Sequence, residues 1–241
     1  VIDACLVRGY HCLIVHGPGQ GMAIREQKLP FRPDWERVVS AVVNFALRIA
    51  GVDGARVALL GLSMGGALVP RAAAFEHRLK ALIANPGVMS WGRAMLQQFE
   101  QYFPEAMPLL EQDPSAFDAV IRDAMDAVPL YDWYMRDSMN KHGVSSPSRL
   151  MAALRDYDNE PTVTDIRCAT LVMDGTAEAF SPGEAKRLYD ALRCPKDYVL
   201  FTAEDRGLLR CQEGASAVST QRMFDWLVDV NLGGVINGMV T

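Results

Sequence analysis

Histidine is scarce in this sequence of 241 residues: it occurs four times, and none follows His142. Cysteine is also thin, with five residues scattered along the chain and no C-x-x-C pair. An odd number of dispersed thiols argues against a disulfide framework and a zinc site, and predicts free, mostly buried thiols in a reducing compartment. We therefore expect no metal ion and no cofactor.

Long apolar runs and clusters of one charge are missing as well. No run reaches the roughly 20 apolar residues needed to span a bilayer, and no cleavable leader pattern opens the sequence. The 24 basic and 29 acidic residues give a net charge of −5, and the basic residues do not cluster. These absences argue against nucleic-acid and membrane partners. We expect a cytoplasmic protein with a small-molecule substrate, and the sequence leaves a homodimer open.

The most informative stretch that is present is residues 61–66, GLSMGG. It follows the apolar run at 57–60 and opens an alanine-rich helical segment. A strand, a sharp turn and a helix are the context in which G-x-S-x-G presents a serine nucleophile. Small flanking residues let the strand and the helix approach closely around a strained turn. Ser63 is therefore the first candidate catalytic residue, and a serine that only caps the helix is the alternative.

Apolar strand patterns alternate with helical patterns along much of the chain, an order typical of a parallel sheet. The predicted strands are 10–15, 57–60, 79–84, 169–174 and 198–201, and the predicted helices are 34–50, 182–192 and 215–230. Half of the residues are hydrophobic, which is ample for a sizeable core.

Residues 89–157 interrupt this alternation with helical stretches rich in methionine and aromatic residues. Because the interruption lies between two predicted strands, we interpret it as an inserted helical cap. Such caps cover the mouth of a site and help to select the substrate. The predicted organisation is a first core segment at 1–88, a cap at 89–157 and a second core segment at 158–241.

In this order the parts resemble the α/β-hydrolase superfamily, and most closely the group that holds dihydroxypseudooxynicotine hydrolase and the polyketide-shortening hydrolases of fungal pigment pathways. The likeness covers nearly the whole chain and rests on residues 17–21, 31–36, 61–66, 70–74 and 211–212. It implies an α/β fold with a mostly parallel sheet, helices on both faces and an inserted helical cap. It also implies further strands upstream of residue 1.

The resemblance further implies an activity and a set of site residues. Ser63 would be the nucleophile toward an ester, a thioester or a C–C bond beside a ketone. The Met64 N–H would be one oxyanion donor, and the second would come from a loop that precedes this sequence. The acid would follow the strand at 169–174, where Glu178 matches the family position and Asp174, at the strand end, is the alternative.

The sequence departs from the family at the base. The family's His-Cys-Gln place reads Arg210-Cys211-Gln212, and a guanidinium has no acceptor lone pair and stays charged. The chain order serine, acid, histidine requires a histidine after the acid, and none exists. Arg210 either binds an anionic substrate group beside Ser63 or points to solvent. A substitution made to trap a complex is a further alternative.

Two earlier histidines are candidates to replace the missing base. His16 follows the strand predicted at 10–15 and is expected either to bind substrate or to bond nearby backbone; His142 lies in the cap, where a solvated turn is favoured. His11 is expected to be a packed or edge residue, and His77 a surface residue on a helix. Three functions stay open: a hydrolase with a non-standard base, a non-hydrolytic enzyme for a cyclisation, condensation or lyase step on a polyketide-like substrate, and a binding protein without turnover.

Overall fold

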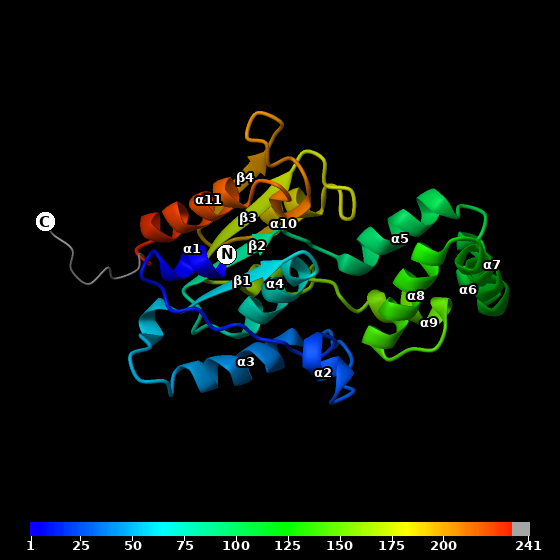
Figure 1. Ribbon diagram of the computed structural model, residues 1–241, viewed down its shortest axis with the longest axis horizontal. Coiled ribbons are helices and arrows are strands. Elements are labelled where there is room, and N and C mark those ends of the chain that lie inside the picture. The colour runs from blue at the N-terminus through cyan, green and yellow to red at the C-terminus, as the bar shows by residue number, and fades with distance from the viewer. Residues whose placement is uncertain (233–241) are drawn as a thin grey trace, which may run out of the picture. The chain divides into compact units, whose positions relative to one another are not determined.

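The computed structural model describes residues 1–232, and its centre is a sheet of four parallel strands (Figure 1). The strands lie in chain order as β1 (Ala58–Leu62), β2 (Ala81–Asn85), β3 (Ala169–Gly175) and β4 (Lys196–Phe201). They coincide with four of the five predicted strands. The predicted parallel α/β sheet is therefore confirmed, while the part of the second core segment beyond residue 232 lies outside the described residues.

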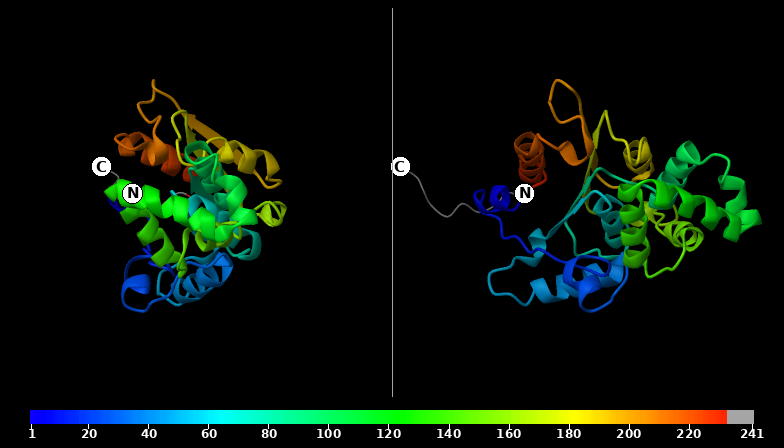
Figure 2. Two further views of the ribbon diagram at one scale, coloured as in Figure 1. Left: turned by 90° about the vertical axis from the view of Figure 1, so that its right-hand side faces the viewer. Right: turned by 45° about the vertical axis from the view of Figure 1, so that its right-hand side comes forward.

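Helices lie on both faces of this sheet, as predicted. One face packs against α1 (Ile2–Leu6) and α11 (Ser216–Asp229), and the other against α4 (Gly65–Phe75) and α10 (Glu184–Ala191), with α3 (Trp35–Ala46) lying on α4. Figure 2 shows α11 and α3 on opposite sides of the strands.

One hydrophobic core cluster forms where alternate strand residues face α11. Successive side chains of a strand point to opposite faces of the sheet. Ile83 on β2 and the pair Leu171 and Met173 on β3 therefore share one face, where they pack with Met223 and Leu227 of α11. The exposed fraction of each of these five side chains is 5% or less. This packing holds the carboxyl ends of the strands, and the loops that follow them, in fixed positions.

The chain divides into two compact units. The first, made of Val1–Val15, Asp34–Met89 and the residues from Asn159 onward, carries the sheet. The second, made of His16–Pro33 and Ser90–Asp158, is helical. It includes residues 16–33, which the sequence assigns to the first core segment, and the cap boundaries at 89–157 stay a prediction.

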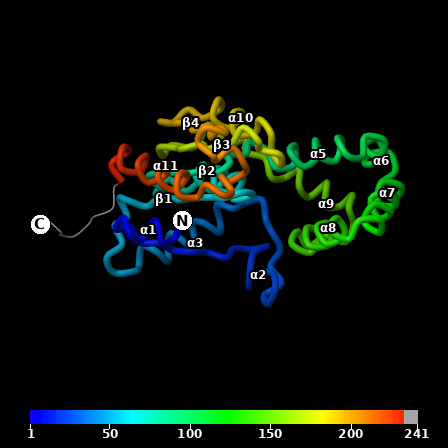
Figure 3. Tube along the Cα trace, turned by 45° about the horizontal axis from the view of Figure 1, so that its top comes forward, coloured from blue at the N-terminus to red at the C-terminus, as the bar shows by residue number. Residues whose placement is uncertain are grey.

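Prolines and short polar side chains begin several helices of the second unit. Its helices, traced in Figure 3, are α2 (Gly21–Arg25), α5 (Trp91–Tyr102), α6 (Met107–Gln112), α7 (Pro114–Ala127), α8 (Pro129–His142) and α9 (Pro147–Leu154). Proline suits the first helical position because the N–H that it lacks has no intrahelical acceptor there. Asp113 caps α7 by accepting a hydrogen bond from the Ala116 N–H at 3.1 Å.

The prediction of a strand at residues 10–15 is wrong. These residues have no regular secondary structure, and Leu13 and Ile14 are 47% and 61% exposed. Strand formation requires hydrogen bonds to a neighbouring strand. Among the described residues, the sheet ends at β1, and residues 10–15 are not part of it.

The thiols differ from the prediction in their burial. All five cysteines lie in the described part of the chain and are free. Cys5 is buried, but Cys12 is exposed because it lies in the irregular segment at residues 10–15. Burial raises the pKa of Cys168 to about 11. Within residues 1–232, no helix has the length and apolar character to cross a membrane, and no acidic, cysteine and histidine cluster is suited to a metal ion.

Candidate active site

Ser63 lies on the sharp turn between β1 and α4. Its φ of 58° is in the left-handed region, where a residue other than glycine costs about 1–3 kcal/mol. The Ser63 N–H donates to the Asn85 carbonyl oxygen at 2.8 Å, which anchors the turn to the end of β2. A Cβ atom on Gly66 would lie 1.8 Å from the Pro86 carbonyl oxygen, so this position needs glycine. The turn predicted from residues 61–66 is present.

Met64 follows Ser63 and is the N-cap residue of α4. The first N–H groups of a helix have no intrahelical acceptor and lie at the positive end of its dipole. The Met64 N–H thus belongs to a turn suited to stabilising negative charge, and its role as an oxyanion donor stays a prediction.

Arg210 contacts Ser63 directly. It begins η3 (Arg210–Gln212), and its Nε donates to Ser63 Oγ at 3.2 Å. The side chain is only 11% exposed, and its guanidinium carbon lies 5.2 Å from the centre of the Phe180 ring. The alternative in which Arg210 points to solvent is therefore wrong, and its role in binding an anionic substrate group stays a prediction. Since a guanidinium only donates, Ser63 Oγ is the acceptor in this contact.

Glu178 balances that charge from the loop after β3. Arg210 Nη1 donates to Glu178 Oε1 at 2.5 Å, and the carboxylate side chain is 3% exposed. The same oxygen accepts hydrogen bonds from the backbone N–H groups of Phe180 at 2.8 Å and Ser181 at 2.9 Å. The Ser181 hydroxyl donates to it as well, at 3.4 Å. Four donors therefore fix Oε1, and the guanidinium bridges the serine and the carboxylate, where a triad would have its imidazole.

Asp174, the alternative acid, has other partners. It lies at the end of β3, accepts a hydrogen bond from the Gly175 N–H at 2.8 Å and another from the Tyr198 hydroxyl at 2.9 Å. Burial raises the pKa of Asp174, and burial together with this aspartate raises the pKa of Tyr198. This arrangement matches the reading of Asp174 as a carboxylate that caps a loop.

The two histidines proposed as bases belong to the second unit. His16 is exposed and lies against the backbone of Gly21, and its role in binding substrate stays a prediction. His142 is not the solvated turn residue that the sequence favours. Its Nδ1 lies 2.9 Å from the Ser138 carbonyl oxygen, and its ring packs on Phe31 and Tyr157. Burial lowers the pKa of His142 below its ordinary value.

The other two histidines lie in the first unit. His11 is exposed within the irregular segment at residues 10–15. His77 is exposed as expected, but it lies beyond the end of α4 and not in a helix. Its Nε2 lies 2.9 Å from the Ala74 carbonyl oxygen.

Phe180 and Ser181 were missed by the sequence reasoning. Phe180 faces the guanidinium of Arg210, and Ser181 Oγ accepts a hydrogen bond from Arg210 Nη1 at 3.1 Å. Their only signal in the sequence is that they follow Glu178 within three residues. Their contacts depend on a loop, at Arg210, that is far away along the chain.

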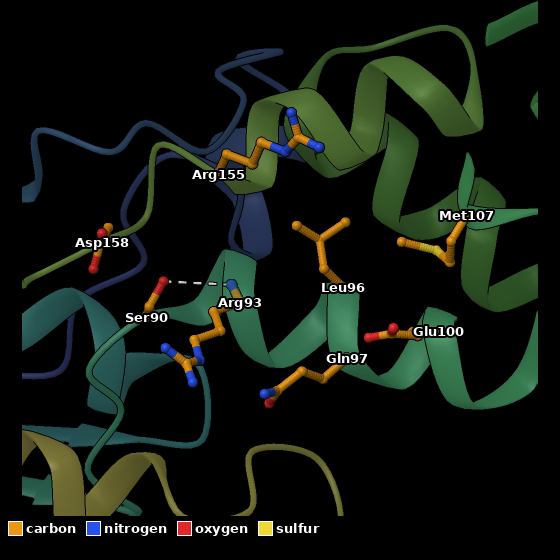
Figure 4. Close-up of a pocket in the computed structure, with 8 residues that line it drawn as sticks. All are labelled: Ser90, Arg93, Leu96, Gln97, Glu100, Met107, Arg155 and Asp158. Atoms are coloured by element: carbon orange, nitrogen blue, oxygen red, sulfur yellow. Dashed lines mark hydrogen bonds between the residues drawn. The ribbon is translucent and has the colours of Figure 1, made fainter. Parts of the chain in front are cut away.

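The second unit contains a cavity of about 370 Å³ along one face of α5 (Figure 4). Helical spacing of three and four residues brings four α5 side chains to this face. The lining consists of Ser90, Arg93, Leu96, Gln97, Glu100, Met107, Arg155 and Asp158. None of the predicted site residues lines this cavity.

Comparison with known proteins gives relatives that are named as hydrolases. The chain is 30% identical over 234 residues to hydrolase LUC6 of Fusarium sp., covering 92% of this chain and 55% of that protein. It is 29% identical over 235 residues to 20-hydroxy-prefusarin hydrolase FUS2 of Gibberella moniliformis, covering 92% of this chain and 55% of that protein. The chain thus spans about half the length of these relatives.

A solved structure supports the same fold. The crystal structure of 2,6-dihydroxy-pseudo-oxynicotine hydrolase matches with a TM-score of 0.72 at 20% identity, over 98% of this chain and 57% of that one. The sequence model of the alpha/beta hydrolase family matches residues 4–229. With this match and the parallel sheet and serine turn described above, the chain belongs to the α/β-hydrolase family.

Proposed function

We propose that this chain acts on a small organic substrate with a carbonyl group: an ester, a thioester or a C–C bond beside a ketone. Ser63 is the reacting hydroxyl, Glu178 the acid, and Arg210 the group that binds or stabilises negative charge beside it. The single observation that carries the proposal is the buried contact from Arg210 Nε to Ser63 Oγ at 3.2 Å, with Glu178 behind the guanidinium.

This geometry favours the stabilisation of charge over the activation of Ser63. Arg210 cannot take the serine proton because it has no lone pair to accept it. In hydrolysis the proton of Ser63 Oγ would have to pass to a group of the substrate or to another residue, with His16 and His142 as the candidates. A fixed guanidinium does suit the negative charge that develops on a carbonyl oxygen, and such preorganised donors supply large rate gains.

Labelling with a fluorophosphonate, together with turnover of a panel of aryl esters, thioesters and 1,3-diketones, tests the proposal. We expect Ser63→Ala to abolish labelling and to lower turnover by at least about 100-fold, because the variant lacks the hydroxyl that reacts with the substrate. Ser219→Ala is the matched control, because Ser219 is a buried serine on α11 whose hydroxyl donates to the Ser216 carbonyl oxygen. Full turnover by Ser63→Ala would contradict the proposal.

A second candidate is a non-hydrolytic reaction, such as a cyclisation, condensation or lyase step on a polyketide-like substrate. The charged Arg210 at the place of the base favours this second candidate. A cation stabilises the negative charge of an enolate, and such a reaction can proceed without a nucleophile. Turnover of a diketone without a covalent adduct on Ser63, lost in Arg210→Ala, would support it. If Arg210→Ala retained the full rate, the arginine would have no part in the mechanism. Ligand binding without turnover of any substrate would indicate a binding protein.

We also propose that the protein is cytoplasmic, that it acts in secondary metabolism, and that it uses no cofactor and has no nucleic-acid or membrane partner. A homodimer is left open. The curated relatives named as hydrolases come from fungi, which supports the role in secondary metabolism only as an analogy.

A further inference from the structure

Asn85, at the end of β2, lies between the two parts of the candidate active site. Its backbone carbonyl oxygen accepts hydrogen bonds from the Ser63 N–H at 2.8 Å and from the Cys211 thiol at 3.3 Å. Its side-chain Nδ2 donates to Gln212 Oε1 at 2.8 Å. One residue thus holds the turn that presents Ser63 and the loop that carries Arg210, which are far apart in the sequence.

The loop held in this way is strained. Cys211 and Gln212 follow Arg210 and both have a φ of 52°, in the left-handed region that residues other than glycine rarely adopt. Two consecutive residues of this kind persist only where their surroundings determine the backbone. The buried amide of Gln212 is one such constraint, since it is 1% exposed and bonded to Asn85.

Stability alone does not explain a buried amide pair at this place. Asn85 is fully buried, and its Oδ1 and Gln212 Nε2 are buried with no hydrogen-bond partner among the described residues. Polar atoms left unsatisfied in the interior are costly, and two apolar side chains of the same shape avoid that cost. What the pair provides is a directional contact that fixes the backbone beside Arg210.

We propose that the Asn85–Gln212 amide pair is a positioning device that sets the reach of Arg210 toward Ser63. The proposal rests on the roles proposed above for Ser63 and Arg210. The two amides are buried and bonded to each other, so we infer that both residues act through Arg210. Replacing the Asn85 side chain leaves its backbone oxygen, and therefore the Ser63 anchor, in place.

The test measures the hydrogen exchange of the Arg210 Nε–H by NMR in protein labelled with ¹⁵N-arginine, with Arg210→Lys used to assign the signal. This readout does not depend on turnover. In Asn85→Leu and Gln212→Met we expect exchange at least about 10-fold faster, because the loss of the amide bond frees the loop to open. Asn159→Leu is the control: Asn159 is also a buried amide of the first unit, and it donates to the Ala67 and Val88 carbonyl oxygens.

Unchanged exchange in Gln212→Met, with folding verified by circular dichroism, would overturn the proposal even if Asn85→Leu failed to fold. Equal acceleration in Asn159→Leu would also overturn it, because the effect would then be a general loss of stability. Faster exchange in the two pair variants alone supports it. Failure of the proposed function is seen separately, as absent labelling and full turnover in Ser63→Ala.

Discussion

Replacing Arg210 by histidine would place an acceptor nitrogen beside Ser63. The Nε of arginine and the Nε2 of histidine are both four bonds from Cα, and Arg210 Nε lies 3.2 Å from Ser63 Oγ. An imidazole at this position therefore reaches the serine hydroxyl and can take its proton. We predict that Arg210→His raises the rate at which a fluorophosphonate labels Ser63.

The size of the gain follows from the position of Glu178. General base catalysis contributes about 100-fold to 10,000-fold. Glu178 Oε1 contacts the outer Nη1 of Arg210 and is held there by the N–H groups of Phe180 and Ser181, whereas the imidazole Nδ1 would lie closer to the backbone. Because the carboxylate then orients the imidazole poorly, we expect the low end of the range, about 100-fold.

The assay follows adduct formation by intact-protein mass spectrometry between pH 5 and 9. In Arg210→His the rate should rise with pH through the ordinary histidine pKa of about 6.5, because only the neutral ring accepts a proton. Arg210→Gln, which removes the charge without adding a base, is the control, and Ser63→Ala in the histidine background should abolish labelling. A labelling rate equal to that of Arg210→Gln in a folded protein would refute the reasoning.

Three further predictions concern stability. Arg210→Met leaves Glu178 buried without its cation and should lower the free energy of unfolding in urea by about 3–5 kcal/mol. Adding Glu178→Leu should recover most of this loss. Equal stability of the single and the double variant would contradict the prediction. Hydrogen bonds from Arg78 lower the pKa of Glu76 to about 2, so its contribution to stability is present above its ordinary value of 4.5 and is lost as the pH falls through about 2. Glu76→Gln should therefore flatten the pH dependence of the free energy of unfolding in that window, and an unchanged slope would disagree. Gly66→Ala puts a Cβ 1.8 Å from the Pro86 carbonyl oxygen and should sharply lower the midpoint of thermal unfolding. An unchanged midpoint would contradict this close approach of Gly66 to Pro86.

The sheet could be predicted from the sequence because its strands are short apolar runs bounded by turns and helices. β1 to β4 all lie at predicted positions. The segment at residues 10–15 has the same kind of pattern, yet it is irregular and exposed. A strand exists only with a hydrogen-bonded neighbour, and a local pattern carries no information about that neighbour.

The candidate active site divides in the same way between local and long-range features. The turn at Ser63 is local, because the glycines on both sides of the serine reveal the tight approach of β1 and α4. The contact between Arg210 and Ser63 joins residues 147 positions apart, and the contact between Arg210 and Glu178 joins residues 32 apart. The spacing of residues in the sequence does not predict contacts between positions so far apart. Only the family resemblance pointed to the position of Arg210.

A crystal structure of the protein tests the central claim most directly, through the position of the Arg210 guanidinium. Our account predicts Nε within about 3.5 Å of Ser63 Oγ, the outer limit of a hydrogen bond, and Nη1 on the carboxylate of Glu178. An Arg210 side chain turned to solvent, with Ser63 Oγ bonded to a different residue, would contradict it.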